Sequence, residues 1–286
     1  MMCIKCGLVK RGGVDFFECE DCKEFSRIIK TIFDDVHEKM EKAETIDPDA
    51  YPILRLLADS SFITSTNPHT AIFYKISDYI VSRAFEGAAE VTEDELNKHV
   101  TTIRGWGDAF KIFEELNLFK VRTEKFRRVL VLSEKTRKFA NQYWTAEKLS
   151  DIGIRKRLAH IYGGYVLLYI LYKMANLSLK TVSNFTLPYG QRPRTLWITL
   201  MFLWTTAYMN VKSFGDEDLR LFISKRRIPS TTRGKIAHAL EAKEGRSTQG
   251  LIKNVRIENG ERKFEFEDYV LLEMQRIREL LRERER

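Results

Sequence analysis

Apolar residues recur at helical spacing in three segments between Phe25 and Phe85. Phe25, Ile28 and Ile32 fall on one face and predict a helix that ends before an Asp-Pro-Asp sequence. A short helix is expected next, over 51–61. A longer amphipathic helix is expected over 71–85. Residues 25–85 are therefore predicted to be mainly helical.

The following segment predicts two short helices and a hairpin. Thr92 and Glu95 have the spacing of a capping box, which opens a helix that ends near Val100. A tight turn over 101–105 leads to a third helix, with Trp106 and later aromatic residues turned inward. Two β-like runs come next, and they flank a polar and basic tip: 119–122, 129–132 and the tip 123–128.

Two nearly charge-free runs, 158–172 and 195–211, dominate the middle of the second half. Each is shorter than the ~20 residues that a helix needs to cross a bilayer. Basic residues flank both runs and fill the loop between them, which no membrane orientation of a two-helix hairpin satisfies. We therefore expect core or dimer-interface helices, and membrane contact is the weaker alternative.

The last 70 residues repeat the theme of helices followed by a hairpin. Acidic residues after Gly215 favour a helix start, and Pro229 suits the first turn of another helix. Apolar and polar residues then alternate on both sides of Asn259-Gly260, a strong hairpin signal. The final segment, 269–286, has one apolar stripe, which indicates a helix that docks on its own domain or forms a homodimer.

The net positive charge of the chain is concentrated near its C-terminus, which bears on the kind of partner that we expect. The chain has 286 residues, with 48 Lys and Arg against 40 Asp and Glu, for a formal net charge of +8. Twelve basic and four acidic residues lie between Arg220 and Lys263, an excess equal to that of the whole chain. This clustering favours a polyanionic partner. The first residues show no secretory signal pattern, so we expect a cytoplasmic protein.

All four cysteines lie in two CxxC pairs separated by twelve residues: Cys3, Cys6, Cys19 and Cys22. Four thiolates at this spacing can surround one zinc ion (Zn²⁺) and leave no open position for catalysis, so a structural role is expected. A disulfide or a redox CxxC is the alternative. Short β-prone runs around Gly12-Gly13 suggest a hairpin with one cysteine pair at each end, and the segment resembles a zinc ribbon.

Residues 69–140 resemble a winged helix-turn-helix module, because three helices precede a hairpin with a basic tip. The resemblance implies that one helix enters the major groove of DNA and that the hairpin, or wing, contacts phosphate or the minor groove. The resemblance implies that four turn and helix positions face bases or phosphates: Thr102, Arg104, Asp108 and Lys111. It implies that five further positions line the wing: Lys120, Arg122, Lys125, Arg127 and Arg128.

The second half resembles the same module. Its implied DNA contacts lie at the end of one helix, at the start of the next and on the second wing: Lys225, Arg226, Arg227, Thr231, Thr232, Arg233, Lys235, Lys253, Arg256, Arg262 and Lys263. Phosphate binding needs clustered cations, whereas base reading needs planar side chains such as arginine.

No enzyme motif stands out in the chain. Patterns such as GxxxxGK[ST], HExxH and GxSxG are missing, and five histidines are scattered singly. We therefore expect a protein that is not an enzyme.

These observations predict a mainly α fold with small β-hairpins, in which an N-terminal zinc ribbon precedes two winged-helix domains. The expected boundaries are 1–24 for the ribbon, 25–68 for a helical linker, 69–150 for the first winged helix and 151–286 for a helical extension with the second. The arrangement resembles archaeal transcription regulators and basal initiation factors, and also the archaeal winged-helix replication initiator. It implies a protein that binds double-stranded DNA. The alternatives are a scaffold on RNA polymerase or replication proteins and a membrane-associated regulator.

Overall fold

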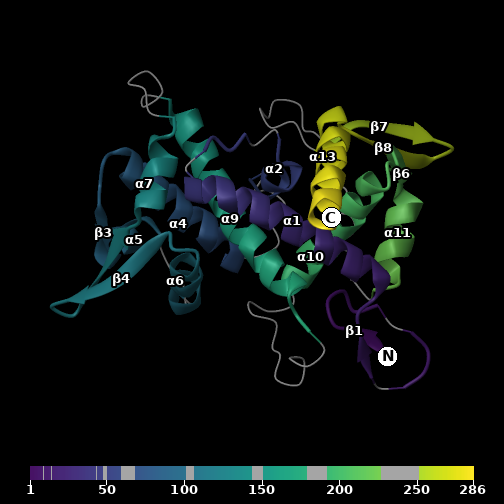
Figure 1. The fold of residues 1–286 in the computed structure, drawn as a ribbon, viewed down its shortest axis with the longest axis horizontal. Helices are drawn as coiled ribbons and strands as arrows, with labels where there is room; N and C mark the ends of the chain where they lie inside the picture. The colour runs from purple at the N-terminus through teal and green to yellow at the C-terminus, as the bar shows by residue number, and fades with distance from the viewer. Residues whose placement is uncertain are drawn as a thin grey trace.

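The computed structural model describes residues 1–286 except 9, 14, 43, 48–49, 59–67, 101–105, 144–150, 179–191 and 227–250. In this part of the chain the fold is mainly helical, with small sheets of two and three strands. Two long helices, α1 (Glu20–Lys42) and α9 (Ile152–Ala175), pack against each other at the centre of the molecule (Figure 1). The segment expected to be a linker thus supplies α1, whose apolar face lies in the core.

The helix α9 is buried on nearly all sides from Leu158 to Ala175, as expected for a core helix without a polar face. It packs against α2 (Pro52–Ala58) and α4 (Pro68–Phe85). Two glycines permit these close approaches. A Cβ atom on Gly163 would lie 2.8 Å from a ring carbon of Tyr74 on α4, and one on Gly164 would lie 3.3 Å from the carbonyl oxygen of Leu54 on α2.

The segment 68–143, here called the first unit, surrounds a three-stranded antiparallel sheet with the order β3-β5-β4. The capping box is confirmed: Thr92 Oγ1 accepts from the Glu95 amide at 3.2 Å, and Glu95 Oε2 accepts from the Thr92 amide at 2.8 Å. The elements after α4 are β3 (Glu90–Thr92), α5 (Glu93–His99), α6 (Trp106–Glu115), β4 (Phe119–Glu124), β5 (Arg127–Leu132) and α7 (Glu134–Asn141).

The hairpin of the first unit is longer than the sequence predicted. We expected a six-residue tip at 123–128, but the pairing continues to Glu124 opposite Arg127 and leaves only Lys125 and Phe126 in the turn. The third strand, β3, was not predicted at all. It pairs with β5 through Val91 opposite Leu130, and both of these side chains are buried.

The segment 192–286, here called the second unit, has a sheet of the same form, with the order β6-β8-β7. Three phenylalanines of the sheet pack together on its inner face, at ring-centroid distances of 5.1 and 5.4 Å: Phe214, Phe264 and Phe266. The elements are α10 (Arg192–Tyr208), β6 (Ser213–Gly215), α11 (Asp216–Ser224), β7 (Ile252–Glu258), β8 (Glu261–Phe266) and α13 (Asp268–Arg284).

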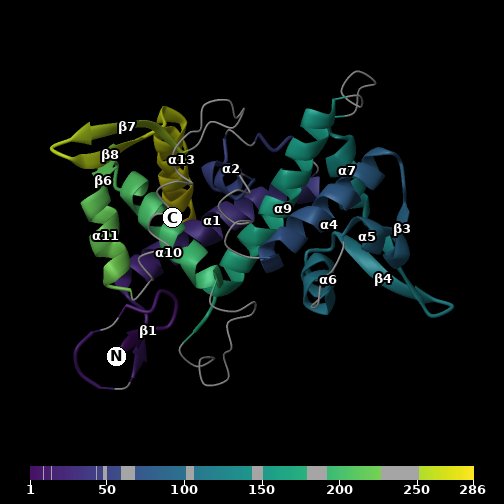
Figure 2. The ribbon, with the colours of Figure 1, turned by 180° about the vertical axis from the view of Figure 1, so that it is seen from behind.

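The two units therefore repeat one arrangement. In each, a three-residue strand leads directly into a helix, the last strand of a hairpin lies at the centre of the sheet, and a further helix follows. The helix starts also match, since the Asp218 carboxylate accepts from the Gly215 amide at 2.7 Å, as Glu95 does from Thr92. The two hairpins lie at opposite ends of the long axis of the molecule (Figures 1 and 2).

The last helix, α13, docks on its own chain. Four of its apolar residues are buried, and it contacts α1, α2 and α10. The Arg276 guanidinium lies 3.2 Å from an Asp35 carboxylate oxygen on α1, and Arg284 lies 2.5 Å from Asp34. The prediction of a helix that docks back on the protein is confirmed. None of the helices in the described ranges combines the length and apolarity that crossing a bilayer requires.

Candidate metal centre and nucleic-acid interface

The four cysteines are brought together by two different local structures. Cys3 ends the strand β1 (Met2–Cys3), and Cys6 follows in a turn closed by a hydrogen bond from the Gly7 amide to the Cys3 carbonyl, at 2.9 Å. Gly7 has a φ of +76°, a conformation that glycine adopts without strain. Cys19 directly precedes α1 and Cys22 lies in its first turn.

The expected ribbon hairpin is wrong. The strand β2 (Phe16–Phe17) pairs with β1 in parallel, with Met2 opposite Phe16 and Cys3 opposite Phe17. The segment between the cysteine pairs therefore loops back and does not turn at Gly12-Gly13 into an antiparallel partner. The reason is that closing the cluster requires residues 2–4 beside the start of α1, and the parallel register achieves this. The second cysteine pair belongs to a helix start.

The cysteine sulfurs lie close enough together to surround one metal ion. Sγ of Cys3 lies 3.7 Å from Sγ of Cys22, Sγ of Cys6 lies 3.6 Å from Sγ of Cys19, and all four sulfurs lie within 4.8 Å of one another. Four thiolates at about 2.3 Å from one Zn²⁺ would stand about 3.8 Å apart. A disulfide needs about 2.05 Å, and all four cysteines are free and buried. The cluster could thus hold one metal ion.

Hydrogen bonds among the four thiols shift their pKa values in opposite directions. Hydrogen bonds from neighbouring thiols, that of Cys19 first, lower the pKa of Cys3, although burial opposes the shift. The hydrogen bond with Cys19, the bonds with the other thiols and burial raise the pKa of Cys22. A bound divalent cation would replace the thiol protons and stabilise four thiolates together, which is how cysteine clusters couple metal binding to folding. All four positions are protein sulfurs, so a bound ion would keep no site for substrate.

Residues of α10 complete the surroundings of the cluster. The Trp197 indole donates its Nε1 hydrogen to Cys22 Sγ at 3.4 Å, and Met201 Sδ lies 3.5 Å from the same sulfur. The Phe25 and Trp197 rings meet edge to face, with centroids 4.7 Å apart. An N–H donor to a thiolate is the kind of outer contact that orients metal ligands. The cysteine spacing contains no signal for this contact, because Trp197 is 175 positions away.

Lys5, between the first two cysteines, is 1% exposed and was not predicted to have a role. Its ammonium group lies 2.6 Å from Glu18 Oε1 and donates to Ser26 Oγ at 2.8 Å and to the Ala175 carbonyl at 2.9 Å. This buried lysine therefore links the cysteine turn to α1 and to the end of α9.

Arg226, predicted to contact DNA, does not lie on the surface. It is 5% exposed, and its guanidinium binds Asp21 at 2.5 Å, donates to the Phe222 carbonyl at 2.7 Å and stacks on the Phe222 ring at 3.6 Å. The prediction is corrected: Arg226 fastens the end of α11 to the start of α1. Its neighbour Lys225 is exposed.

The arginines of the first hairpin are paired with carboxylates of β3, α5 and β4. Arg128 binds Glu93 at 2.6 Å through two hydrogen bonds, and Arg127 lies 3.6 Å from Asp94. Arg122 lies 3.0 Å from Glu90 and 2.8 Å from Glu124. Three lysines of this region are exposed and have no carboxylate within ion-pair distance among the described residues: Lys111, Lys120 and Lys125.

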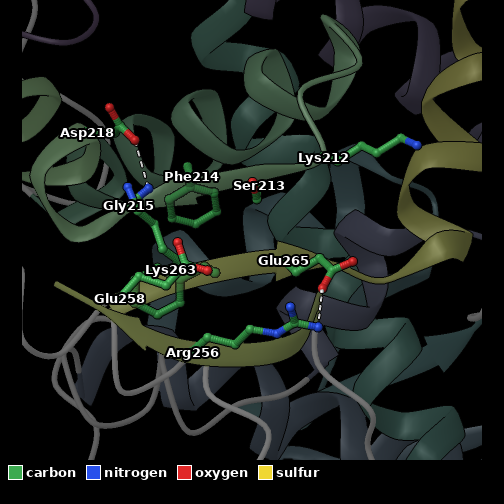
Figure 3. A pocket seen from close by; sticks show the side chains of 10 residues that line it. Lys212, Ser213, Phe214, Gly215, Asp218, Arg256, Glu258, Lys263 and Glu265 are labelled. Atoms are coloured by element: carbon green, nitrogen blue, oxygen red, sulfur yellow. Dashed lines mark hydrogen bonds and ion pairs between the residues drawn. The ribbon is translucent and has the colours of Figure 1, made fainter. Parts of the chain in front are cut away.

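The second hairpin is equally mixed in charge. Arg262 binds Asp216 at 2.6 Å, and Lys253 lies 3.3 Å from Glu265 and 3.1 Å from Asp268. Figure 3 shows a hollow on the outer face of this sheet, where Arg256 reaches Glu265 at 3.9 Å. The charged residues that line it balance: Lys212, Arg256 and Lys263 against Asp218, Glu258 and Glu265. The described cations of the second hairpin are therefore interleaved with carboxylates.

Several predicted DNA contacts fall outside the described residues. They belong to the turn before α6 and to the segment after Arg226: Thr102, Arg104, Arg227, Thr231, Thr232, Arg233 and Lys235. The structure does not bear on them.

One exposed residue was overlooked in the sequence. Phe126 occupies the turn between β4 and β5 with its side chain fully exposed, at 103%. The sequence contained a signal for this exposure, because Phe126 is the single apolar residue in a tip that we described as polar and basic.

Comparison of the chain with family models, with curated proteins and with solved structures gave no match, so its assignment depends on the geometry described above.

Proposed function

We propose that this protein binds double-stranded DNA through two winged-helix units on a common helical core, with a structural zinc ion in the cysteine cluster. The observation that carries the proposal is the repeated arrangement. In the first unit a helix, a strand, two helices and a hairpin follow in the order of a winged helix. In the described part of the second unit a helix, a strand and a helix precede residues 227–250, a hairpin and a helix follow them, and the strand order is the same.

The surface supports salt-sensitive phosphate contact more than base reading. Lys111 on α6, Lys120 on β4 and Lys125 in the turn are exposed, and no described carboxylate pairs with them. The side chains of the paired arginines Arg122, Arg127 and Arg128 are 44–75% exposed, and such ion pairs contribute only about 0–1 kcal/mol each. DNA phosphates can therefore compete for them at low salt.

A protein of this kind would act in the cytoplasm, in transcription regulation or initiation or in recognition of a replication origin. Its role would be binding and not catalysis. RNA polymerase or replication proteins would be additional partners.

Affinity for a duplex, measured against salt concentration, tests the proposal. The logarithm of affinity should fall steeply with the logarithm of salt, and each phosphate contact that is lost should reduce the slope by about one. We expect the triple variant Lys111→Gln, Lys120→Gln, Lys125→Gln to flatten the slope. The matched control, Lys23→Gln, Lys42→Gln, Lys138→Gln, loses the same charge from helix surfaces where each lysine is paired with a glutamate. Equal slopes for the two variants would contradict the proposed surface.

A protein-interaction scaffold is the second candidate, and the ion pairs favour it. Carboxylates hold arginines of both hairpins, so much of the positive charge of these surfaces is already matched within the protein. A scaffold keeps its protein partner after nucleic acid is removed. A DNA-binding protein loses those proteins that were attached to it only through the DNA. Pull-down before and after nuclease treatment, with the partner identified by mass spectrometry, separates the two candidates.

A further inference from the structure

The turn at the end of the first hairpin holds two residues poorly suited to it. Lys125 has a φ of +44° and Phe126 a φ of +68°, both in the left-handed region. A bulky side chain is uncommon there because its Cβ approaches the neighbouring carbonyl oxygen. The Phe126 ring gains nothing from packing, since it is 103% exposed. Folding alone therefore does not account for these two residues.

The second hairpin provides an internal comparison. Its turn has the same pair of left-handed residues, Asn259 at +52° and Gly260 at +79°. Asparagine and glycine are the residues that this turn favours. The chain thus uses the suitable pair at one hairpin and an unsuitable, exposed pair at the other. Strained residues of this kind point to a functional constraint.

The two tips also differ in charge. The first tip, Glu124 to Arg128, carries three cations and one carboxylate, and that carboxylate is engaged by Arg122 at 2.8 Å. Arg127, next to Phe126, is 75% exposed. At the second tip Glu258 stands opposite Glu261 across the strands. Only the first tip combines an exposed aromatic ring with positive charge on both sides.

We propose that Phe126 is a wedge that enters the minor groove of DNA and partly unstacks one base step, with Lys125 and Arg127 on the phosphates beside it. This inference rests on the proposed DNA-binding function and assigns the first hairpin a task that the second does not share. Apolar side chains inserted from the minor groove kink the duplex. A two-residue turn can present such a ring without hindrance from the rest of the fold.

The charge of the tip selects DNA over an apolar protein groove. The Phe126 ring lies between the ammonium group of Lys125 and the guanidinium group of Arg127 in the sequence. These two cations suit the phosphates on either side of a base step, and the bases supply the surface on which the ring stacks. An anionic lipid surface offers similar charge, so the test includes it.

The experiment compares the full chain with Phe126→Ala and with Ile257→Ala, which removes another exposed apolar side chain (76%) near the tip of the second hairpin. Duplex bending is measured by energy transfer between end labels, and unstacking by the fluorescence of 2-aminopurine in the duplex. We expect Phe126→Ala to weaken binding about tenfold and to remove the bend and the fluorescence increase. Its salt slope should stay unchanged, because no charge is lost. Ile257→Ala should behave as the unaltered protein does.

Two outcomes would overturn the wedge. One is a duplex bound and bent equally by Phe126→Ala and the unaltered protein. The other is unchanged DNA affinity with lost binding to vesicles of phosphatidylserine and phosphatidylcholine, which would assign the ring to a lipid surface. Failure of the unaltered protein to bind any duplex at low salt is a different result: it contradicts the proposed function itself, and the wedge with it.

Discussion

Arg226 and Lys125 were predicted to belong to one kind of interface, yet their surroundings differ completely. Arg226 is buried between α11 and the start of α1, and its partner Asp21 lies 205 positions earlier in the chain. Lys125 stands at the end of a hairpin. Local sequence shows that both are cations beside a predicted helix end or turn. It cannot show that one meets a distant carboxylate, and this is why the burial of Arg226 could not be predicted from the sequence.

Strain at the first turn predicts a gain in stability when it is relieved. Replacing Lys125 by Asn and Phe126 by Gly places a favoured pair in the same left-handed conformation. We expect the free energy of unfolding to rise by about 1 kcal/mol, because left-handed backbone costs about 1–2 kcal/mol per ordinary residue while glycine adds freedom to the unfolded chain. Urea unfolding followed by circular dichroism measures the change.

The reverse exchange in the second hairpin is the control. Asn259→Lys with Gly260→Phe should lower stability by a similar amount, since both positions have positive φ. A first-turn exchange that destabilises the protein would show that the Lys125-Phe126 pair is held by contacts and is not strained.

At the scale of elements, the sequence predicted those features that depend only on residues close together in the chain. The capping box at Thr92 and the turn at Asn259-Gly260 were both found from residue type and spacing. The strands β3 and β6 were missed because three residues are too few to show alternation. Their existence depends on β5 and β8, which come later in the chain and provide the hydrogen bonds. The parallel pairing of β1 with β2 likewise depends on closing the cysteine cluster.

The crossing of α9 with α4 gives a prediction for Gly163. Alanine normally favours a helix over glycine by about 0.5–1 kcal/mol. Here the added methyl would lie 2.8 Å from the Tyr74 ring, so we expect Gly163→Ala to lower the free energy of unfolding by roughly 1–3 kcal/mol. Thermal and urea unfolding measure it.

The variant Gly164→Ala is the comparison for Gly163→Ala. Its nearest neighbour is the Leu54 carbonyl at 3.3 Å, so the loss should be smaller. An increase in stability for Gly163→Ala would mean that the two helices can separate without loss, contrary to the close packing described.

At the scale of the whole molecule, residues 1–24, here called the cysteine module, contact elements that lie far apart in the sequence. Lys5 reaches the end of α9, Cys22 meets Trp197 on α10, and Asp21 binds Arg226 after α11. The sequence predicted the metal site from four cysteines alone. It could not predict this role, because burial of Lys5 or Arg226 depends on tertiary partners and leaves no local pattern.

Removing the proposed zinc ion should therefore affect the second unit before the first. After chelation we expect faster amide hydrogen exchange in residues 1–30, in α10 and in α11, while α4 stays protected, because α10 and α11 contact the module directly. Hydrogen exchange with mass spectrometry measures this, and excess Zn²⁺ should restore the original pattern. Equal loosening of α4 and α10 would contradict the asymmetry.

The long reach of these contacts also sets an order of events during synthesis on the ribosome. The cysteines are translated about 200 residues before Arg226. At 5–20 residues per second the ribosome needs roughly 10–40 s to cover that interval. A cation can thus be captured by the nascent cysteines long before the surfaces of α10 and α11 exist to cover them. The loaded module would then serve as a preformed template on which the later helices assemble.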